Sequence, residues 1–319
     1  MKLRFIYNPC SGKNRRNPWL LEELRRCCAR NDIVAALSIT ERPGHATELA
    51  LRALAEGCTH VVAVGGDGTM NETAQALVGS EATLGLVPCG SGNGLALHLG
   101  IPTQPLDALR LLFDGNATDV CIDTGRADGH PFFNAMGIGL DAEISRRFNL
   151  LQRRGLPSYV RTTLGALCRH RPLDITVTDA SGSSLRTRAM LAAVANSDQY
   201  GNMALIAPGA RVDDGLLDLV ILQPVGLPGA IQAAYRLFNG TLDSFSRVKR
   251  MRSSSFVMER PSPGPIHTDG ETRQAGTRIA VAVRPRSLRI VVPATSAARS
   301  ATAPTVTDPG PISTCPHHG

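Results

Sequence analysis

The stretch Gly65-Gly66-Asp67-Gly68-Thr69-Met70-Asn71-Glu72 decides the fold, because it joins an apolar run at residues 61–64 to a helical pattern. Three glycines within four residues let the backbone turn sharply and bring its N–H groups close to a ligand. The helix that follows points its positive end at the same place, which suits a polyphosphate. A single loop of this kind is a weak signal, because tight turns explain most glycine clusters.

Two further glycine loops follow apolar runs in the same part of the chain. Asn8-Pro9-Cys10-Ser11-Gly12-Lys13 follows residues 3–7, and Pro88-Cys89-Gly90-Ser91-Gly92-Asn93-Gly94 follows residues 83–87. The carboxyl ends of parallel strands meet at one edge of a sheet, so the three loops are expected to converge. They predict a nucleotide site that includes Asn8, Ser11, Lys13, Gly65, Gly66, Asp67, Gly68, Thr69, Asn71, Glu72, Gly90, Gly92 and Asn93.

Acidic side chains stand beside the expected phosphates. Asp67 and Glu72 would repel them, and a bound Mg²⁺ would remove that conflict. Asp123, at the end of the last strand before the pattern changes, is a third candidate ligand, held directly or through water. A turn residue is an equally good reading of Asp123.

The fold class follows from the order of the patterns. Strand and helix signals alternate up to residue 123, with helices expected at 19–30, 45–56, from about 71, and at 105–113. Hairpin signals then dominate, with strands at 173–178, 185–195 and 216–222 and helices at 141–171 and 228–238. We predict a parallel α/β domain at 1–123, an antiparallel β domain with helices at 124–284, and a disordered tail at 294–319.

Composition narrows the class of protein. The hydrophobic fraction of 43% excludes disorder for most of the chain. The eight cysteines form no CxxC pair, which favours free thiols and a cytoplasmic location without structural zinc. Cys10 and Cys89 lie in two glycine loops, where nearby N–H groups would make them reactive, or where they are small buried side chains. No signal peptide or membrane-spanning run is recognised.

The net charge of +7 is unevenly distributed. Residues 144–173 contain seven arginines and no acidic residue, interleaved with apolar positions. Such a helical segment is either a solvated face or a surface attracted to anionic lipid headgroups. Nucleic acid is not expected as a partner, because no nucleic-acid-binding motif or interleaved aromatic residues accompany the charge.

The motifs NPCSGK, GGDGTMNE and PCGSGN, in this order and spacing, resemble the catalytic domain shared by diacylglycerol kinases, sphingosine kinases and their bacterial relatives. NAD kinases and phosphofructokinases share a GGDG element, but here Asn71-Glu72 directly continues it. The resemblance covers nearly the whole chain. It implies an ATP-dependent lipid kinase that uses Mg²⁺, with lipid bound by the second domain and residues 285–293 returning to the first.

The resemblance also implies roles for single residues. Thr40, in Thr40-Glu41-Arg42-Pro43-Gly44, matches a nucleotide-contacting threonine, and Ser91 matches another nucleotide-binding hydroxyl. Asp213-Asp214-Gly215-Leu216 resembles a structural magnesium site formed by the Asp214 carboxylate and the carbonyls of Arg211 and Leu216. His267-Thr268-Asp269-Gly270-Glu271 resembles the family's DGE motif, with Asp269 as the general base and Glu271 in reserve. The residues alone would read both segments as turns.

One departure bears on the acceptor. Bacterial diacylglycerol kinases often carry Asn-Asp-Phe-Ala after the third loop, whereas this chain has Asn93-Gly94-Leu95-Ala96, as in sphingosine and ceramide kinases. The expected acceptor is therefore diacylglycerol or a sphingoid base, on a peripherally bound membrane surface. The alternatives are a kinase of a soluble polyol or dinucleotide, and a nucleotide-sensing module without turnover. The oligomeric state stays open, a homodimer included.

Overall fold

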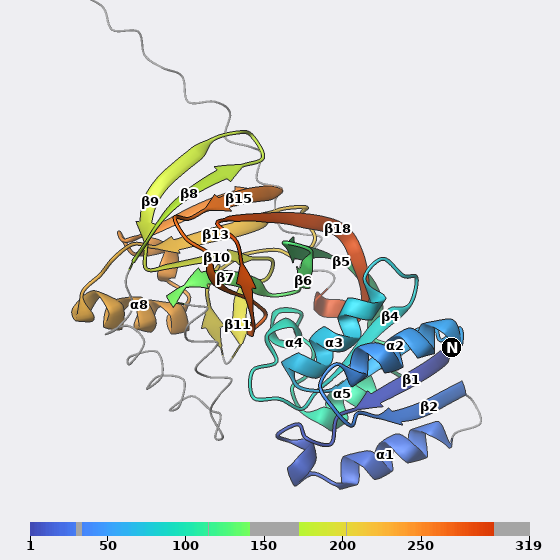
Figure 1. The fold of residues 1–319 in the computed structure, drawn as a ribbon. Helices are drawn as coiled ribbons and strands as arrows, with labels where there is room; N and C mark the ends of the chain where they lie inside the picture. The colour runs from blue at the N-terminus through green and yellow to red at the C-terminus, as the bar shows by residue number, and fades with distance from the viewer. Residues whose placement is uncertain (30–33, 114, 141–171, 202, 297–319) are drawn as a thin grey trace, which may run out of the picture.

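A computed structural model describes residues 1–29, 34–113, 115–140, 172–201 and 203–296. These residues form two lobes, an α/β lobe and a β-rich lobe (Figure 1). The predicted fold class is confirmed, since parallel strands with helices come first and antiparallel strands follow.

The first lobe is a parallel sheet with the strand order β2-β1-β3-β4. Its core holds fully buried Phe5, Val62 and Leu84 from these strands, with Leu24 and Leu77 from the helices. Each strand is followed by a loop and a helix, which places the loops at one edge of the sheet. The bounds are β1 Lys2–Tyr7, α1 Trp19–Cys28, β2 Val34–Ile39, α2 His45–Ala55, β3 His60–Gly65, α3 Asp67–Leu77, β4 Thr83–Pro88, α4 Gly94–His98 and α5 Pro105–Leu111.

Helix α3 begins at Asp67, earlier than the sequence predicted. Gly66 is its N-cap in an extended conformation, and Asp67 lies in the first turn. A carboxylate is favourable there because the first N–H groups of a helix lack partners within it. The motif is therefore the first turn of the helix itself, rather than a loop that leads to it.

The second lobe is a sandwich of two sheets. One has the order β14-β13-β10-β7-β16-β17, and it packs on β15, β8 and β9 through buried Met136, Ile138, Val177, Phe256 and Met258. A second core lies between the first sheet and α8. The bounds are β7 Ala135–Gly139, β8 Leu173–Asp179, β9 Ser184–Ala189, β10 Leu191–Ala195, β13 Leu217–Leu222, α8 Leu227–Asn239, β14 Val248–Ser253, β15 Ser255–Glu259, β16 Gly264–Thr268 and β17 Glu271–Ala275.

The single strand predicted for residues 185–195 is wrong. The chain forms β9 up to Ala189 and β10 from Leu191, and these strands belong to different sheets. Met190 marks the crossing, and its N–H bonds to the carbonyl of Leu222. Strand β9 alternates exposed and less exposed side chains whereas β10 is almost entirely buried, and the break was missed because no glycine or proline separates the two strands.

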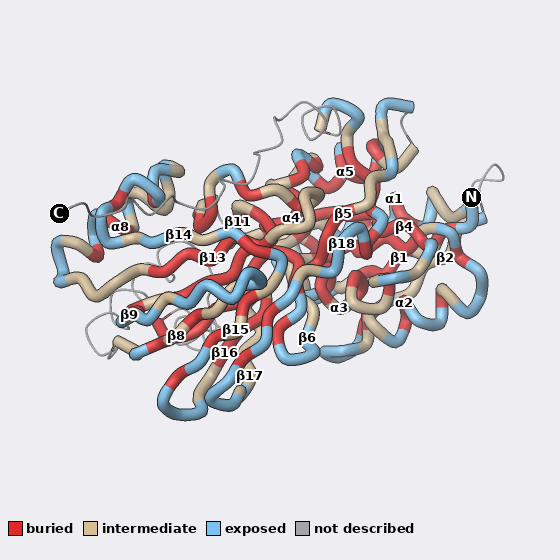
Figure 2. The backbone as a smooth tube through the Cα atoms, turned by 90° about the horizontal axis from the view of Figure 1, so that it is seen from above, coloured by how far each residue is buried: buried red, intermediate tan, exposed pale blue. Residues whose placement is uncertain are grey.

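Strand β18 (Arg278–Pro293) connects the two lobes. Its first half pairs with β15, and Arg289 and Ile290 pair in parallel with β4 of the first lobe. Its neighbour on the other side is β5 (Ala117–Ala127), with an irregularity between Arg284 and Leu288. Viewed from above, β18 and β5 run between the buried strands of both lobes (Figure 2).

Two expectations fall partly or wholly outside the described residues: the helices and arginines at 141–171, and the tail from 297. Residues 294–296 are helical, and the N–H of Ala294 bonds to the carbonyl of Asn116 at 2.8 Å. Order therefore extends past the predicted start of the tail. Within the described part of the chain, no helix has both the length and the apolar character needed to cross a bilayer.

Candidate active site

The three glycine loops converge at the carboxyl ends of β1, β3 and β4. The side-chain amide of Asn8 donates to Oγ1 of Thr69 at 2.9 Å, which joins the first loop to the second. The N–H of Gly66 donates to Oγ of Ser11 at 3.2 Å. The N–H of Lys13 donates to the carbonyl of Cys89 at 2.9 Å, which joins the first loop to the third. The loops thus form one hydrogen-bonded unit, as their strand positions predicted.

Close backbone contact explains two of the glycines. A Cβ on Gly90 would lie 2.7 Å from the Cα of Gly66, and a Cβ on Gly66 would lie 3.0 Å from the Cα of Gly90. Backbone atoms cannot swing aside as a flexible side chain can, so either substitution would push the loops apart. By contrast, a Cβ on Gly68 would meet no atom within 4 Å. Gly66 and Gly90 therefore allow the second and third loops to pack together, whereas Gly68 leaves open space at the start of α3.

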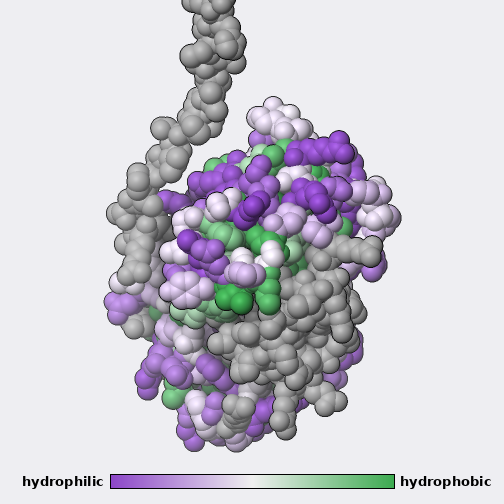
Figure 3. All heavy atoms as spheres, turned by 90° about the vertical axis from the view of Figure 1, so that its left-hand side faces the viewer, coloured by the Kyte–Doolittle hydropathy of each residue, from purple (hydrophilic) through white to green (hydrophobic). Residues whose placement is uncertain are grey.

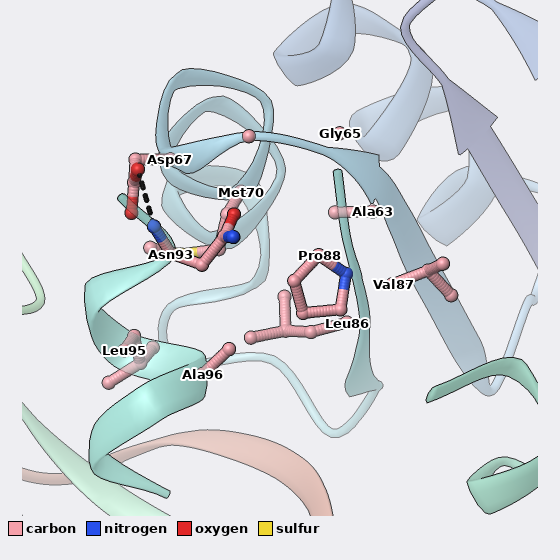
Figure 4. Close-up of a pocket in the computed structure, with 11 residues that line it drawn as sticks. Ala63, Gly65, Asp67, Met70, Leu86, Val87, Pro88, Asn93, Leu95 and Ala96 are labelled. Carbon is pink, nitrogen blue, oxygen red and sulfur yellow. Dashed lines mark hydrogen bonds between the residues drawn. The ribbon is translucent and has the colours of Figure 1, made fainter. Parts of the chain in front are cut away.

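The Asp67 carboxylate points into the third loop. Its oxygens accept the N–H groups of Asn93 and Gly94, each at 2.9 Å, at the start of α4 (Figure 4). Glu72 does the same for α2, accepting the N–H of Gly44 at 2.9 Å and that of Ala46 at 3.1 Å. Both carboxylates therefore hold loops around α3. Their expected role as Mg²⁺ ligands stays a prediction, and a cation would have to share oxygens that N–H groups already use.

The remaining predicted nucleotide residues border the same edge. Thr40 is buried at the end of β2, and its N–H bonds to the carbonyl of Tyr7. Nζ of Lys13 donates to the carbonyl of Thr103 at 2.7 Å, while Ser91 is exposed. The buried Oδ1 of Asn71 has no hydrogen-bond partner among the described residues. Such an acceptor suits a water, a cation or a ligand donor.

A small apolar cavity lies beneath the loops. It has a volume of about 20 Å³ and is lined by Met70, Leu86, Pro88, Leu95 and Ala96, among others (Figure 4). That is roughly the room for one water molecule. The cavity is therefore too small to hold a nucleotide.

Of the two alternatives for Cys89, the structure supports the small buried side chain. Its side chain is fully buried, and burial raises the pKa of the thiol to about 12. The thiol donates to the carbonyl of Val87 at 3.3 Å. Cys89 is thus a small core residue, whereas Cys10 is exposed. The nearby N–H groups of Gly90 and Asn93 donate to the Asn93 side chain and to Asp67, not to the Cys89 thiol.

Asp269 occupies the tight turn between β16 and β17. Its φ is 48° and that of Gly270 is 85°, the left-handed pair of a two-residue hairpin turn. The carboxylate accepts three backbone N–H groups: Phe133 at 2.7 Å on Oδ2, and Asn134 at 2.8 Å and Ala135 at 3.0 Å on Oδ1. Oδ2 is left with more free acceptor capacity than Oδ1. It is the oxygen suited to receive a proton.

Burial raises the pKa of Asp269 to about 6, and the three N–H groups and the nearby His267 oppose the rise. A base works best when its pKa lies near the working pH. Glu271, the reserve base, is instead paired with Nη2 of Arg273 at 2.8 Å. This geometry favours Asp269 over Glu271.

The segment that receives Asp269 is held by residues that the sequence reasoning missed. The amide of Asn196 donates to the carbonyls of Phe133 at 3.0 Å and Asp123 at 2.9 Å. The hydroxyl of Ser197 donates to Oδ1 of Asn134 at 2.9 Å. Asn196 is 1% exposed and Ser197 0%, so these bonds form without competition from solvent. A polar pair directly after the apolar strand β10 was the available signal.

Contacts also connect the second glycine loop to Asp269, the candidate base. The N–H of Gly94 bonds to Asp67, and a Cβ on Gly94 would lie 3.3 Å from Oδ1 of Asn134. Asn134 in turn donates its N–H to Asp269. One chain of neighbours thus runs from Asp67 through Gly94 and Asn134 to Asp269. It brings residues from the two lobes into one site.

Asp123 and the Asp213-Asp214-Gly215 loop form a separate cluster. Asp123 accepts the N–H of Gly215 at 2.6 Å and that of Arg286 at 2.7 Å. Burial raises the pKa of Asp123, those two N–H groups lower it, and the nearby Asp214 raises it. Asp214 is paired with Arg252 and accepts the N–H of Leu216.

The magnesium set expected at this cluster has one carboxylate and two backbone carbonyls, and the Asp214 carboxylate is already paired with Arg252. Among the described residues, no three acidic, histidine or cysteine groups are placed to hold a metal. A cation at Asp214 would have to displace Arg252, and the described contacts place Asp67 with the third glycine loop instead. The ligand roles of Arg211, Asp214, Leu216 and Asp123 stay predictions.

Comparison with known proteins agrees with this arrangement. Residues 2–125 match the diacylglycerol kinase catalytic domain, and residues 134–292 match the YegS C-terminal NAD kinase beta sandwich-like domain. A Pseudomonas putida protein named "Probable lipid kinase YegS-like" is 33% identical over 270 residues, covering 82% of this chain and 87% of that protein.

Two further proteins extend the comparison. The "Diacylglycerol kinase" of Bacillus subtilis is 29% identical over 252 residues, covering 75% of this chain and 79% of that protein. A crystal structure of a diacylglycerol kinase from Bacillus anthracis shares the fold, with a TM-score of 0.70 at 19% identity, covering 91% of this chain and 96% of that one. The resemblance seen in the three loops is confirmed, and the chain belongs to the lipid kinase family built on the diacylglycerol kinase catalytic domain.

Proposed function

We propose that this protein transfers the γ-phosphate of ATP to a hydroxyl group of a lipid, either diacylglycerol or a sphingoid base. The observation that carries the proposal is the chain of contacts from Asp67 through Gly94 and Asn134 to Asp269. These contacts support Asp269 as the base, because burial raises its pKa to about 6 and the chain of contacts leads from it to loops suited to phosphates.

The reaction assigns a task to each part of the site. The hydroxyl of the lipid gives its proton to Oδ2 of Asp269 while its oxygen forms a bond to the γ-phosphorus. The bond between that phosphorus and the bridging oxygen of ATP breaks, and ADP leaves. Loop N–H groups and the N-terminus of α3 stabilise the phosphate charge. Bound Mg²⁺, where present, would neutralise further charge beside Asp67 and the Asn71 amide oxygen.

Gly94 bears on the acceptor. A Cβ there would lie 3.3 Å from both Oδ1 of Asn134 and the N–H nitrogen of Gly201. An aspartate at this position would require those neighbours to move. The site therefore differs from bacterial diacylglycerol kinases at a position next to the base segment, which keeps a sphingoid base as an acceptor alongside diacylglycerol.

The test is transfer of labelled γ-phosphate by the full chain with Mg²⁺. The acceptors are diacylglycerol, sphingosine, ceramide and undecaprenol in mixed micelles, together with glycerol and NAD in solution. We expect label on diacylglycerol or sphingosine. Label only on glycerol or NAD would replace the proposal with a soluble-substrate kinase. ATP binding without transfer to any acceptor would indicate a nucleotide sensor.

A further inference from the structure

Helix α8 carries an exposed apolar stripe. Leu227, Ile231 and Tyr235 are 53%, 60% and 69% exposed, and they are spaced four residues apart, so they lie along one face of the helix. On the face of the molecule that carries α8, hydrophobic side chains gather near the middle of the view, with hydrophilic side chains above them (Figure 3).

The helix is oriented against the usual pattern. Its fully buried positions are the small Ala230 and Ala233, and Ala233 belongs to the core that also holds Val220 and Phe245. A surface helix normally turns its large apolar side chains inward. Here Leu237 packs against the core, but Leu227, Ile231 and Tyr235 face outward, so folding does not gain the hydrophobic free energy of these three side chains. Three large apolar side chains exposed along one helix face make this stripe a candidate interaction site, although its area alone is ordinary for a protein surface.

The charge around the helix favours an anionic partner. Residues 227–239 contain no Asp or Glu. Val225, just before the helix, packs with Leu140, the last described residue before the segment that carries seven arginines between 144 and 173. That sequence therefore leaves the described structure beside α8. Its positive charge suits a surface of anionic lipid headgroups.

The stripe also lies on the lobe that meets the glycine loops. Strands β11 (Gln199–Gly201) and β12 (Ala204–Leu205) form a hairpin. Its first strand packs on α4, and its second strand packs on α8. Gly201 sits against the third loop, since its Cβ would lie 3.4 Å from the Cα of Gly92. A single hairpin therefore connects helix α8, and any membrane bound to it, with the candidate active site.

The size of the stripe excludes a stable dimer as its main use. A helix of 13 residues is about 20 Å long and about 10 Å wide, which gives a strip of roughly 200 Å². A stable protein interface buries about 800 Å² per partner. A lipid surface has no such minimum, because each inserted side chain adds its own transfer free energy.

We propose that α8 docks this protein on an anionic lipid surface by inserting Leu227, Ile231 and Tyr235 among the acyl chains. The proposal rests on the proposed function, because a kinase of lipids must reach its acceptor in a membrane. It adds the surface that makes the contact.

The experiment compares wild type with the double variant Ile231→Gln, Tyr235→Gln in flotation with vesicles of phosphatidylglycerol and phosphatidylcholine. The matched control is Val34→Gln with Leu51→Gln, whose side chains are 64% and 53% exposed on the first lobe. We expect the α8 variant to lose about tenfold or more in vesicle affinity. The control should bind as wild type does, and both variants should keep wild-type thermal stability and ATP binding.

Vesicle binding needs no turnover, so this test is independent of the proposed function. A wild type that binds vesicles through α8 but phosphorylates no lipid would refute the function and leave the docking surface standing. Equal vesicle affinity in wild type and the α8 variant would overturn the docking proposal. A loss of self-association in light scattering without a loss of vesicle binding would assign the stripe to a second copy of the chain and also overturn it.

Discussion

Two Asp-Gly turns with nearly the same backbone have very different surroundings. Asp128 and Gly129, between β5 and β6 (His130–Phe132), have φ values of 44° and 89°, and Asp269 and Gly270 have 48° and 85°. Asp128 is exposed, and its carboxylate accepts the N–H of Ala280. The Asp269 carboxylate accepts three backbone N–H groups from residues 133–135, the segment that leads from β6 into β7. The two turns therefore share a backbone conformation, and the residues around each carboxylate determine its hydrogen bonds and its burial.

The largest expected difference between the turns is in turnover. We expect Asp269→Asn to lower kcat by roughly 100-fold or more, because the amide cannot accept the hydroxyl proton. Asp128→Asn is the matched control, since it makes the same change in the same turn geometry, and it should keep kcat within about twofold of wild type. Initial rates at saturating ATP and lipid measure both. If the two variants retained equal activity, Asp269 would be only a turn residue.

A second difference concerns pH. The raised pKa of Asp269 means that the base is protonated below about pH 6, so kcat/KM should fall about tenfold per pH unit there. Asp128→Asn should leave that limb in place. A profile that is flat between pH 5 and pH 7 would remove Asp269 from the role of base.

The same pKa has a consequence for stability. The folded value of about 6 lies above the unfolded value of about 4, so the native state binds the extra proton more tightly. This group's contribution to stability is therefore fully present below about pH 4 and is lost as the pH rises through 6. Urea unfolding of Asp269→Asn between pH 4 and pH 7 should lack that decline.

Asn196 holds the segment whose N–H groups bind Asp269, so a substitution at Asn196 tests the importance of these surroundings. Asn196→Leu keeps the side chain's size but leaves the carbonyls of Phe133 and Asp123 without their donors. We expect about a tenfold loss of kcat and a shifted acid limb, with ATP affinity unchanged. Ser197→Ala, which removes one bond to Asn134, should have a smaller effect in the same direction. A variant that lost stability but kept its pH profile would make Asn196 purely structural.

How much of this could be predicted depends on distance along the chain. The α/β lobe and its loops were predicted because strand, glycines and helix are contiguous in Gly65 to Glu72. The site around Asp269 joins residues 133–135, 196–197 and 269, which no local pattern connects. The resemblance supplied Asp269, but neither it nor the residues indicated the three N–H groups. Met190 and the Asp67 contacts were missed for the same reason, since both depend on segments distant in sequence.

The smallest expected effect comes from the glycine of each turn, where a substitution changes the backbone conformation and leaves the aspartate in place. Gly129 and Gly270 have positive φ values, which an alanine adopts at a cost of about 1 to 2 kcal/mol. A Cβ on Gly270 would meet nothing within 4 Å, and one on Gly129 would approach only Arg126, at 3.6 Å. Gly129→Ala and Gly270→Ala should therefore lower the free energy of unfolding by similar amounts in urea titrations. Only Gly270→Ala should also lower kcat, because rotation of its turn moves the Asp269 carboxylate relative to Phe133 and Ala135. If both variants lost activity equally, the loss would reflect general stability, and the contrast between the turns would not extend to catalysis.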